Sequence, residues 1–173
     1  MPSIEIRTDV LAPEKEYVAT YKNVPKPTQL VPEMLQMGKS NWRVPSSCAY
    51  TDKIMWDVSG EPIDWYGEWR FRDKRDNFTT VFIRVICQGT YDKKTKTGDV
   101  TVKVKPVMET KFEWNNPVMG GLWYIWFKTF YQEQMRKVIR LEQVRVQEFD
   151  DEIRIILGIG RRELHGPLTR RGL

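Results

Sequence analysis

Side chains suited to catalysis are scarce in this chain of 173 residues. It has one histidine, His165, and two widely separated cysteines, Cys48 and Cys87, whose spacing fits neither a zinc site nor a disulfide framework. We therefore expect two free thiols, buried or half-buried, in a reducing cytoplasmic compartment. The sequence has no nucleophile-elbow, zinc-protease, phosphate-loop or dinucleotide-binding motif. These absences favour a protein without a catalytic role, a metal or a cofactor.

Long apolar runs are lacking as well. The longest one, around Trp123, is interrupted by Lys128, whereas a membrane-spanning helix needs about 20 consecutive apolar residues. The opening stretch MPSIEIRTDV is polar and alternating, so we expect no secretory signal. With 40% hydrophobic and 29% charged residues, the composition is that of a globular protein, and we expect no membrane span.

The positive charge is unevenly distributed along the chain. The net charge is +5, yet residues 119–157 carry equal numbers of basic and acidic side chains. Much of the surplus lies in residues 158–173, GIGRRELHGPLTRRGL, which hold four arginines and one glutamate. This segment is either a solvated tail or a contact for nucleic acid or another anionic partner. We expect residues 1–157 to form one domain and residues 158–173 a basic tail; the oligomeric state is not indicated.

The first third of the chain predicts short elements. Alternating segments at residues 4–10 and 17–22 indicate two strands, separated by the Ala12-Pro13 break. A short helix is expected from residue 27, where a proline fits the first turn, to about residue 38, where a glycine can end it. Residues 39–49 are expected to form a loop.

Longer strands dominate the middle of the chain. Residues 50–58, 65–73 and 78–87 have the alternating or continuous apolar patterns of consecutive strands. The clearest strand covers residues 100–114, where apolar and charged side chains alternate. Pro106 within it predicts a bulge or an edge position. Strands of this length must twist, so we expect a curved antiparallel meander.

Six aromatic residues fall within positions 123–131, at the start of a helical pattern. Neither proline nor glycine occurs in residues 122–157, and apolar residues recur at helical spacing. We expect a long amphipathic helix entered through the flexible pair Gly120-Gly121, with a break near residues 149–151 as an alternative. Its aromatic face should pack on the sheet. The predicted fold class is α+β, with a curved antiparallel β-sheet wrapped around a long C-terminal helix and one short helix after the N-terminal strands.

This order of elements, with the strand-to-helix junction EWNNPVMGGLWYIWF, resembles the helix-grip fold of the START/Bet v1-like (SRPBCC) superfamily. The resemblance covers roughly residues 15–150. It implies a hydrophobic cavity between sheet and helix, which members use for lipids, sterols, polyketides or other apolar molecules. Some members are catalysts or protein-binding modules instead, so the fold does not choose between these functions.

Our first expectation is therefore a non-catalytic, lipid-binding type of protein that holds an apolar or amphipathic small molecule between sheet and helix. A solid aromatic core without a cavity is the alternative. Arg84 lies between apolar residues, so it should extend its charged end to water, pair with a carboxylate or hold the polar end of a ligand. The candidate ligand-binding residues are Trp56, Trp69, Phe82, Arg84, Phe112, Trp114, Trp123, Phe127 and Tyr131.

A second expectation is an interaction protein that docks on RNA or a ribonucleoprotein through basic groups. In that case the aromatic residues form core only. The candidate contacts are Lys93, Lys94, Lys96, Arg161, Arg162, Arg170 and Arg171. An enzyme of the cyclase or hydrolase type is third, because members of the resembled superfamily include such enzymes, although no residue here is identified as a catalytic group.

Overall fold

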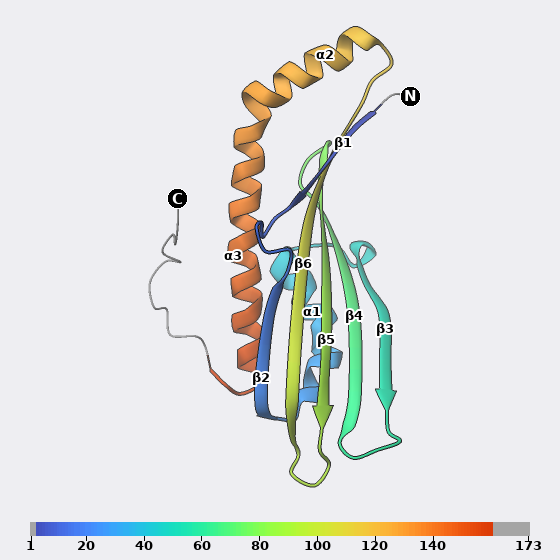
Figure 1. Ribbon diagram of the computed structural model, residues 1–173, viewed down its shortest axis with the longest axis vertical. Helices are drawn as coiled ribbons and strands as arrows, with labels where there is room; N and C mark the ends of the chain where they lie inside the picture. The colour runs from blue at the N-terminus through green and yellow to red at the C-terminus, as the bar shows by residue number, and fades with distance from the viewer. Residues whose placement is uncertain (1–2, 161–173) are drawn as a thin grey trace.

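The computed structural model describes residues 3–160 and contains one antiparallel sheet with helices on one of its faces (Figure 1). The predicted α+β fold class is confirmed. The strands are β1 (Ser3–Asp9), β2 (Tyr17–Pro25), β3 (Ala49–Asp57), β4 (Ile63–Lys74), β5 (Thr79–Tyr91) and β6 (Thr97–Glu113). The helices are α1 (Leu30–Trp42), α2 (Pro117–Trp126), the π-helical segment η3 (Phe127–Tyr131) and α3 (Gln132–Ile156), with short 3₁₀ turns at Pro27–Gln29 and Ser46–Cys48.

The strand order is β1-β6-β5-β4-β3, and β2 also pairs with β6. Two strands therefore share one edge of β6, with β2 along its first half and β1 along its second half. Pro106 lies at the gap between them, where its carbonyl accepts a hydrogen bond from the Val10 N–H at 3.3 Å. The backbone nitrogen of Pro106, which carries no hydrogen, therefore points toward this gap, and the pairing of β6 with β5 is continuous. Neither predicted setting for Pro106 is found: β6 is an interior strand, its register with β5 has no bulge, and the proline lies at the gap between β1 and β2.

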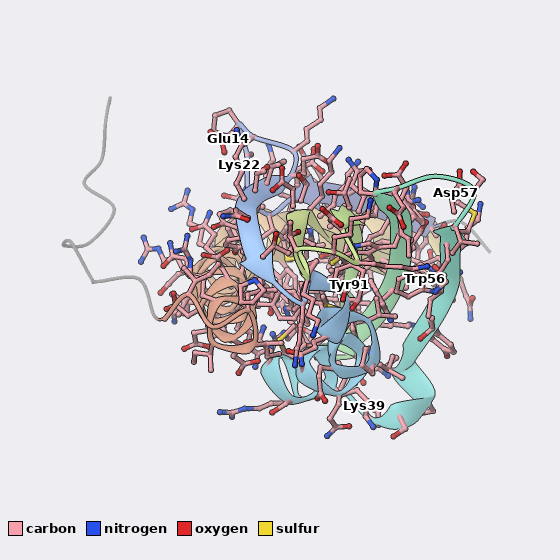
Figure 2. All side chains as sticks on the ribbon, turned by 90° about the horizontal axis from the view of Figure 1, so that it is seen from below. Glu14, Lys22, Lys39, Trp56, Asp57 and Tyr91 are labelled. Carbon is pink, nitrogen blue, oxygen red and sulfur yellow. The ribbon has the colours of Figure 1, made fainter. Side chains whose placement is uncertain are left out.

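The sheet curves around the two helices that cover its inner face. Viewed from below, the strands form an arc with α1 and α3 inside it (Figure 2). Along β6, alternate residues face this interior and are buried, while the residues between them are more exposed. The centre of the interior is filled by large side chains, with the Trp42 ring 5.3 Å from Phe71 and 4.6 Å from Phe149. One core cluster contains buried residues of β2, α1, the strands β3 to β6, η3 and α3.

The helix α1 continues past the predicted end at residue 38. Gly38 lies inside the helix because Phe71 of β4 packs directly on it, and a Cβ there would lie 2.1 Å from the ring. Arg43, in the left-handed conformation at φ 53°, ends the helix instead. The prediction of a loop from residue 39 was wrong for this reason, since glycine here serves close packing and not chain reversal.

The C-terminal helical segment begins earlier and bends elsewhere than predicted. The Asn116 side chain caps α2 by accepting the Val118 N–H at 3.1 Å, so both Gly120 and Gly121 are helical. The alternative break near residues 149–151 is wrong, because α3 is continuous there. The irregular turn is η3, where the Thr129 hydroxyl donates to the Ile125 carbonyl at 2.7 Å. The path of the segment bends between α2 and α3 (Figure 1).

Candidate functional site

An aromatic cluster joins the upper end of the sheet to the start of the C-terminal helical segment. Phe112 of β6 lies 5.1 Å from both Phe78 and Trp123, measured between ring centroids. Trp126 lies 5.3 Å from Trp123 and 5.0 Å from Tyr131. Rings at these separations stabilise each other beyond the area they bury. The cluster therefore holds α2 and η3 against the end of the sheet.

The β4–β5 turn fixes the base of this cluster through hydrogen bonds. The Asp76 carboxylate accepts the backbone N–H groups of Phe78 and Thr79, each at 2.7 Å, and the Tyr131 hydroxyl at 2.7 Å. Tyr131 is also hydrogen bonded to the Thr79 hydroxyl. Burial, together with the bond to Asp76, raises the pKa of Tyr131. This phenol is a positioned donor and not a proton-transfer group near neutral pH.

Outside the ring cluster, α2 borders an apolar hollow. Its volume is about 370 Å³, and it is lined by Met119, Leu122, Trp123 and Trp126. A second hollow of about 470 Å³ shares Met119 and Trp123 with the first and adds polar groups, including Glu113 and Asn115. The two hollows thus place an apolar wall next to a polar rim. Their sizes fall in the range of small-molecule sites.

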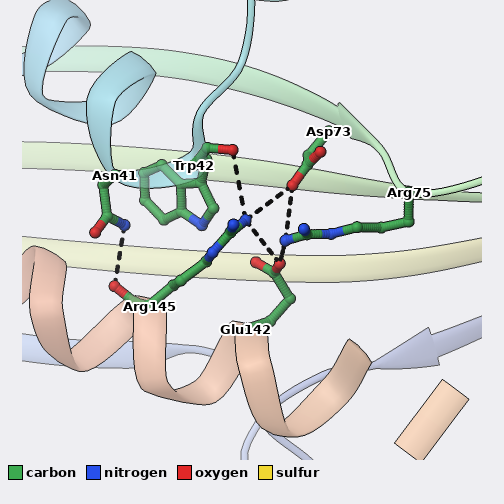
Figure 3. Close-up of polar contacts among 6 residues, drawn as sticks. All are labelled: Asn41, Trp42, Asp73, Arg75, Glu142 and Arg145. Atoms are coloured by element: carbon green, nitrogen blue, oxygen red, sulfur yellow. Dashed lines mark hydrogen bonds and ion pairs between the residues drawn. The ribbon is translucent and has the colours of Figure 1, made fainter. Parts of the chain in front are cut away.

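A group of four charged side chains, three of them buried and one half-buried, lies deeper along α3, between this helix and the end of β4 (Figure 3). Asp73 accepts from Arg145 at 3.0 Å and pairs with Arg75 at 2.7 Å. Glu142, which is fully buried, pairs with both arginines. Burial lowers the pKa of Arg75. We define these four residues as the buried ion network.

The buried ion network connects three elements and faces no hollow described above. Arg145 also donates to the Trp42 carbonyl at 3.4 Å, and Asn41 donates to the Arg145 carbonyl at 3.0 Å (Figure 3). Both contacts lie at the end of α1. Two acidic and two basic groups balance in charge, which is the arrangement that buried ions require. We assign the network a structural role, which is to fasten α3 to β4 and α1.

The structure distributes the nine predicted ligand-binding residues over several places. Trp69, Phe112 and Tyr131 are buried on the inner face, while Trp123 and Phe127 are half-buried in the aromatic cluster. Trp114 packs against Gly120 and lines the second hollow. The remaining three residues lie elsewhere: Trp56 is on the edge strand β3 far from α3 (Figure 2), and Phe82 and Arg84 are on the outer face of the sheet.

Arg84 forms an ion pair with a carboxylate, which is one of its three predicted alternatives. Its Nε lies 2.6 Å from Glu68 Oε1 on the outer face. The hydrogen bond from Arg84 lowers the pKa of Glu68. Arg84 also stands in a row with Arg70 and Lys105 on neighbouring strands, beside a hollow of about 640 Å³. That hollow is larger than the apolar one, but its charged lining makes it a poor place for an apolar molecule.

Sequence reasoning missed Phe78, Met119 and Leu122 as members of the aromatic end. Phe78 was assigned to a strand, whereas it ends the turn that Asp76 organises. Met119 and Leu122 were placed before or at the entrance of the helix. The signal that could have found them is the Asn116-Pro117 pair, since asparagine followed by proline is a helix start. With that start, Met119, Trp123 and Trp126 fall at helical spacing.

The two cysteines are free, with Cys48 half-buried and Cys87 fully buried. Burial raises the pKa of Cys87, so its thiol is not an activated nucleophile. Within residues 3–160 no group of three His, Cys, Asp or Glu side chains is placed to hold a metal ion. None of the helices in that range has the length and apolar content to cross a membrane.

The three predicted lysine contacts fall at the opposite end of the molecule from α2. Lys93, Lys94 and Lys96 are exposed in the turn between β5 and β6, where Lys94 pairs with Glu61 at 3.3 Å. The predicted arginine contacts and the lone histidine lie outside the described residues, namely Arg161, Arg162, His165, Arg170 and Arg171.

No protein-family model matches the chain, and no curated protein matches it. Solved structures similar to it include the protein of unknown function SA2116 from Staphylococcus aureus, at 7% identity and a TM-score of 0.32, covering 90% of this chain and 95% of that one. An uncharacterized protein from Rhizobium leguminosarum has 6% identity and a TM-score of 0.27, covering 91% and 99%. Likenesses at this level carry no conclusion about function.

Proposed function

We propose that this α+β protein is a non-catalytic binding protein that holds an apolar or amphipathic small molecule between the end of its sheet and the start of its C-terminal helical segment. The observation that carries the proposal is the pair of adjoining hollows at α2, one apolar and one with a polar rim, which share Met119 and Trp123. The apolar part of a ligand would lie against Met119 and Trp126. Its polar group would lie near Glu113 and Asn115.

This location differs from the centre of the sheet, where Trp42, Phe71 and Phe149 pack on one another. The aromatic cluster supplies a rigid wall for the ligand, because its rings contact one another and the sheet. A rigid wall lowers the cost of binding, since few side chains need to be ordered when the ligand arrives. The resemblance to the START/Bet v1-like superfamily implies the same class of ligand, and it remains part of this proposal.

The first test is binding of Nile red, an uncharged apolar dye, followed by fluorescence in buffer without lipid. We expect Met119→Asp to weaken binding at least about tenfold, because a carboxylate facing the apolar wall must be desolvated when the dye enters. Met119 is 46% exposed, so the substitution should not prevent folding. Val118→Asp is the matched control, since Val118 is the adjacent exposed residue and does not line the hollow.

Equal loss in the two variants, or no binding by the unaltered protein, would refute the proposal. Native mass spectrometry of protein purified gently from its own host gives the second readout. A small-molecule adduct that survives moderate salt supports the ligand site. Co-purified nucleic acid that is lost as salt rises would favour docking on RNA instead.

A further inference from the structure

The helix α2 exposes apolar side chains on more than the side that borders the hollow. Val118, Leu122 and Ile125, at positions i, i+4 and i+7, are 68%, 57% and 62% exposed. Tyr124 is also exposed, on a further side of the helix. Only the side toward the aromatic cluster is partly covered, by the contacts of Trp123 and Trp126. Isolated exposed apolar residues are ordinary, but a helix that is apolar around its circumference marks an interaction site.

The position of α2 makes this surface accessible. It lies at one end of the molecule, beyond the strands, and the bend at η3 directs it away from the line of α3 (Figure 1). Its ten residues give it a length of about 15 Å, roughly half the thickness of the hydrocarbon core of a bilayer. It is too short to span a membrane and long enough to enter one leaflet.

The charges of α2 and η3 themselves are of one sign, and the nearby Glu113 is paired with Lys111. No acidic residue occurs from residue 114 to residue 132, and the single charged side chain in that stretch is Lys128. Lys128 is exposed, with its Nζ 5.1 Å from the centre of the Tyr124 ring. Along the exposed side of α3 follow Arg136 and Arg140, neither of which has an ion-pair partner within residues 3–160. These cations complement an anionic surface.

A lipid bilayer fits these features better than a second copy of the chain. A cylinder of the length of α2 and about 10 Å across has a side area of roughly 470 Å². Two such helices present at most about half of that area to each other, so together they cover roughly 470 Å², well below the ~1,200 Å² of a specific interface. A protein groove that contacts α2 from one side would also leave part of the circumference of α2 in water. Lipid can cover every side of α2 that the protein leaves exposed, and tryptophan and tyrosine are the residues that favour the boundary between lipid and water.

We propose that α2 docks the protein on anionic lipid bilayers by lying in the interface, with Val118, Leu122 and Ile125 among the acyl chains and Lys128, Arg136 and Arg140 at the phosphate groups. An interfacial helix with apolar residues and adjoining cations binds by these two contributions together. The inference goes beyond the ligand site, because Val118 and Ile125 do not line the hollow. It does not require that a small molecule is bound.

The test is co-sedimentation of the full chain with phosphatidylcholine vesicles, prepared with and without phosphatidylglycerol. We expect binding to the anionic vesicles, accompanied by a blue shift of the tryptophan emission. Ile125→Asp and Val118→Asp should each lower the partition coefficient at least about tenfold, because each removes a buried apolar side chain and adds a charge. Val58→Asp is the matched control, since Val58 has the same exposure as Val118 and lies in the turn after β3.

The double variant Arg136→Glu/Arg140→Glu separates the two contributions. It should weaken binding to the anionic vesicles several-fold and leave any binding to neutral vesicles unchanged. The docking proposal is overturned if the unaltered protein stays in the supernatant with anionic vesicles. It is also overturned if light scattering shows a dimer that Ile125→Asp converts to a monomer without any vesicle binding. Nile red binding in buffer, which Met119 controls, reports on the ligand site independently of either outcome.

Discussion

At the scale of single residues, Glu142 shows how far the stability of this structure depends on buried charged groups. Its carboxylate is fully buried and pairs with Arg75 and Arg145, while Asp73 balances the second positive charge. The individual ions are costly to bury, and only their mutual contacts offset that cost. Removal of one charge should therefore be far more damaging than removal of an exposed one.

We predict that Glu142→Gln lowers the free energy of unfolding by about 3 kcal/mol, because it leaves the buried guanidinium of Arg145 and the half-buried one of Arg75 with one carboxylate. Urea unfolding followed by circular dichroism measures the change. Glu133→Gln is the matched control on the same helix, since Glu133 pairs with Lys137 in an exposed i, i+4 arrangement. Its cost should stay below about 0.5 kcal/mol. Similar costs for both substitutions would show that the buried ion network stabilises the fold no more than an exposed ion pair does.

No pattern in the sequence indicates the buried ion network. Residues 119–157 are balanced in charge, and charged residues on an amphipathic helix normally face water. Glu142 and Arg145 are spaced as any exposed i, i+3 pair would be. They are buried only because the end of β4 brings Asp73 and Arg75 onto the same stretch of α3, and that approach is a property of the assembled fold.

At the scale of elements, the helical glycines differ in what surrounds them. Gly38 in α1 is covered by the Phe71 ring, whereas Gly121 in α2 has no atom of another residue within 4 Å of where a Cβ would stand. Alanine is favoured over glycine in a helix by about 1 kcal/mol. The same substitution should therefore have opposite effects at the two positions.

We predict that Gly121→Ala raises the free energy of unfolding by up to about 1 kcal/mol, through helix propensity alone. Gly38→Ala should lower it by about 1–3 kcal/mol, because the methyl group displaces the Phe71 ring and strains the core. Thermal and urea unfolding of both variants measure the difference. Stabilisation by Gly38→Ala would mean that α1 can move away from β4 without cost.

At the scale of the whole molecule, one core cluster runs from β2 to α3, and the aromatic cluster and the buried ion network both connect α3 or its neighbours to the sheet. Nothing in this arrangement separates the long helix from the strands as an independent unit. We infer that the sheet and α3 gain their stability together.

We accordingly predict one cooperative unfolding transition for the described core. Far-ultraviolet circular dichroism reports on the helices, and tryptophan fluorescence reports on the core rings. Their midpoints in urea should coincide, because helix and sheet cannot keep their structure without the shared core. Loss of the tryptophan signal at clearly lower urea than the helical signal would show that α3 is stable apart from the sheet.

The fold class could be predicted from sequence alone, because periodicity shows which face of each element is buried. The patterns that carried it were the alternation in β6, the long helical pattern without proline, and the order of the elements. Sequence also predicted an ion pair with a carboxylate as one of the alternatives for Arg84, and the structure has that pair. Tertiary structure decided the rest: that Gly38 packs under a ring, that Phe82 and Arg84 face away from α3, and that Met119 and Trp123 join two hollows. Periodicity describes one element at a time, whereas a site depends on how the curvature of the sheet and the bend at η3 bring separate elements together.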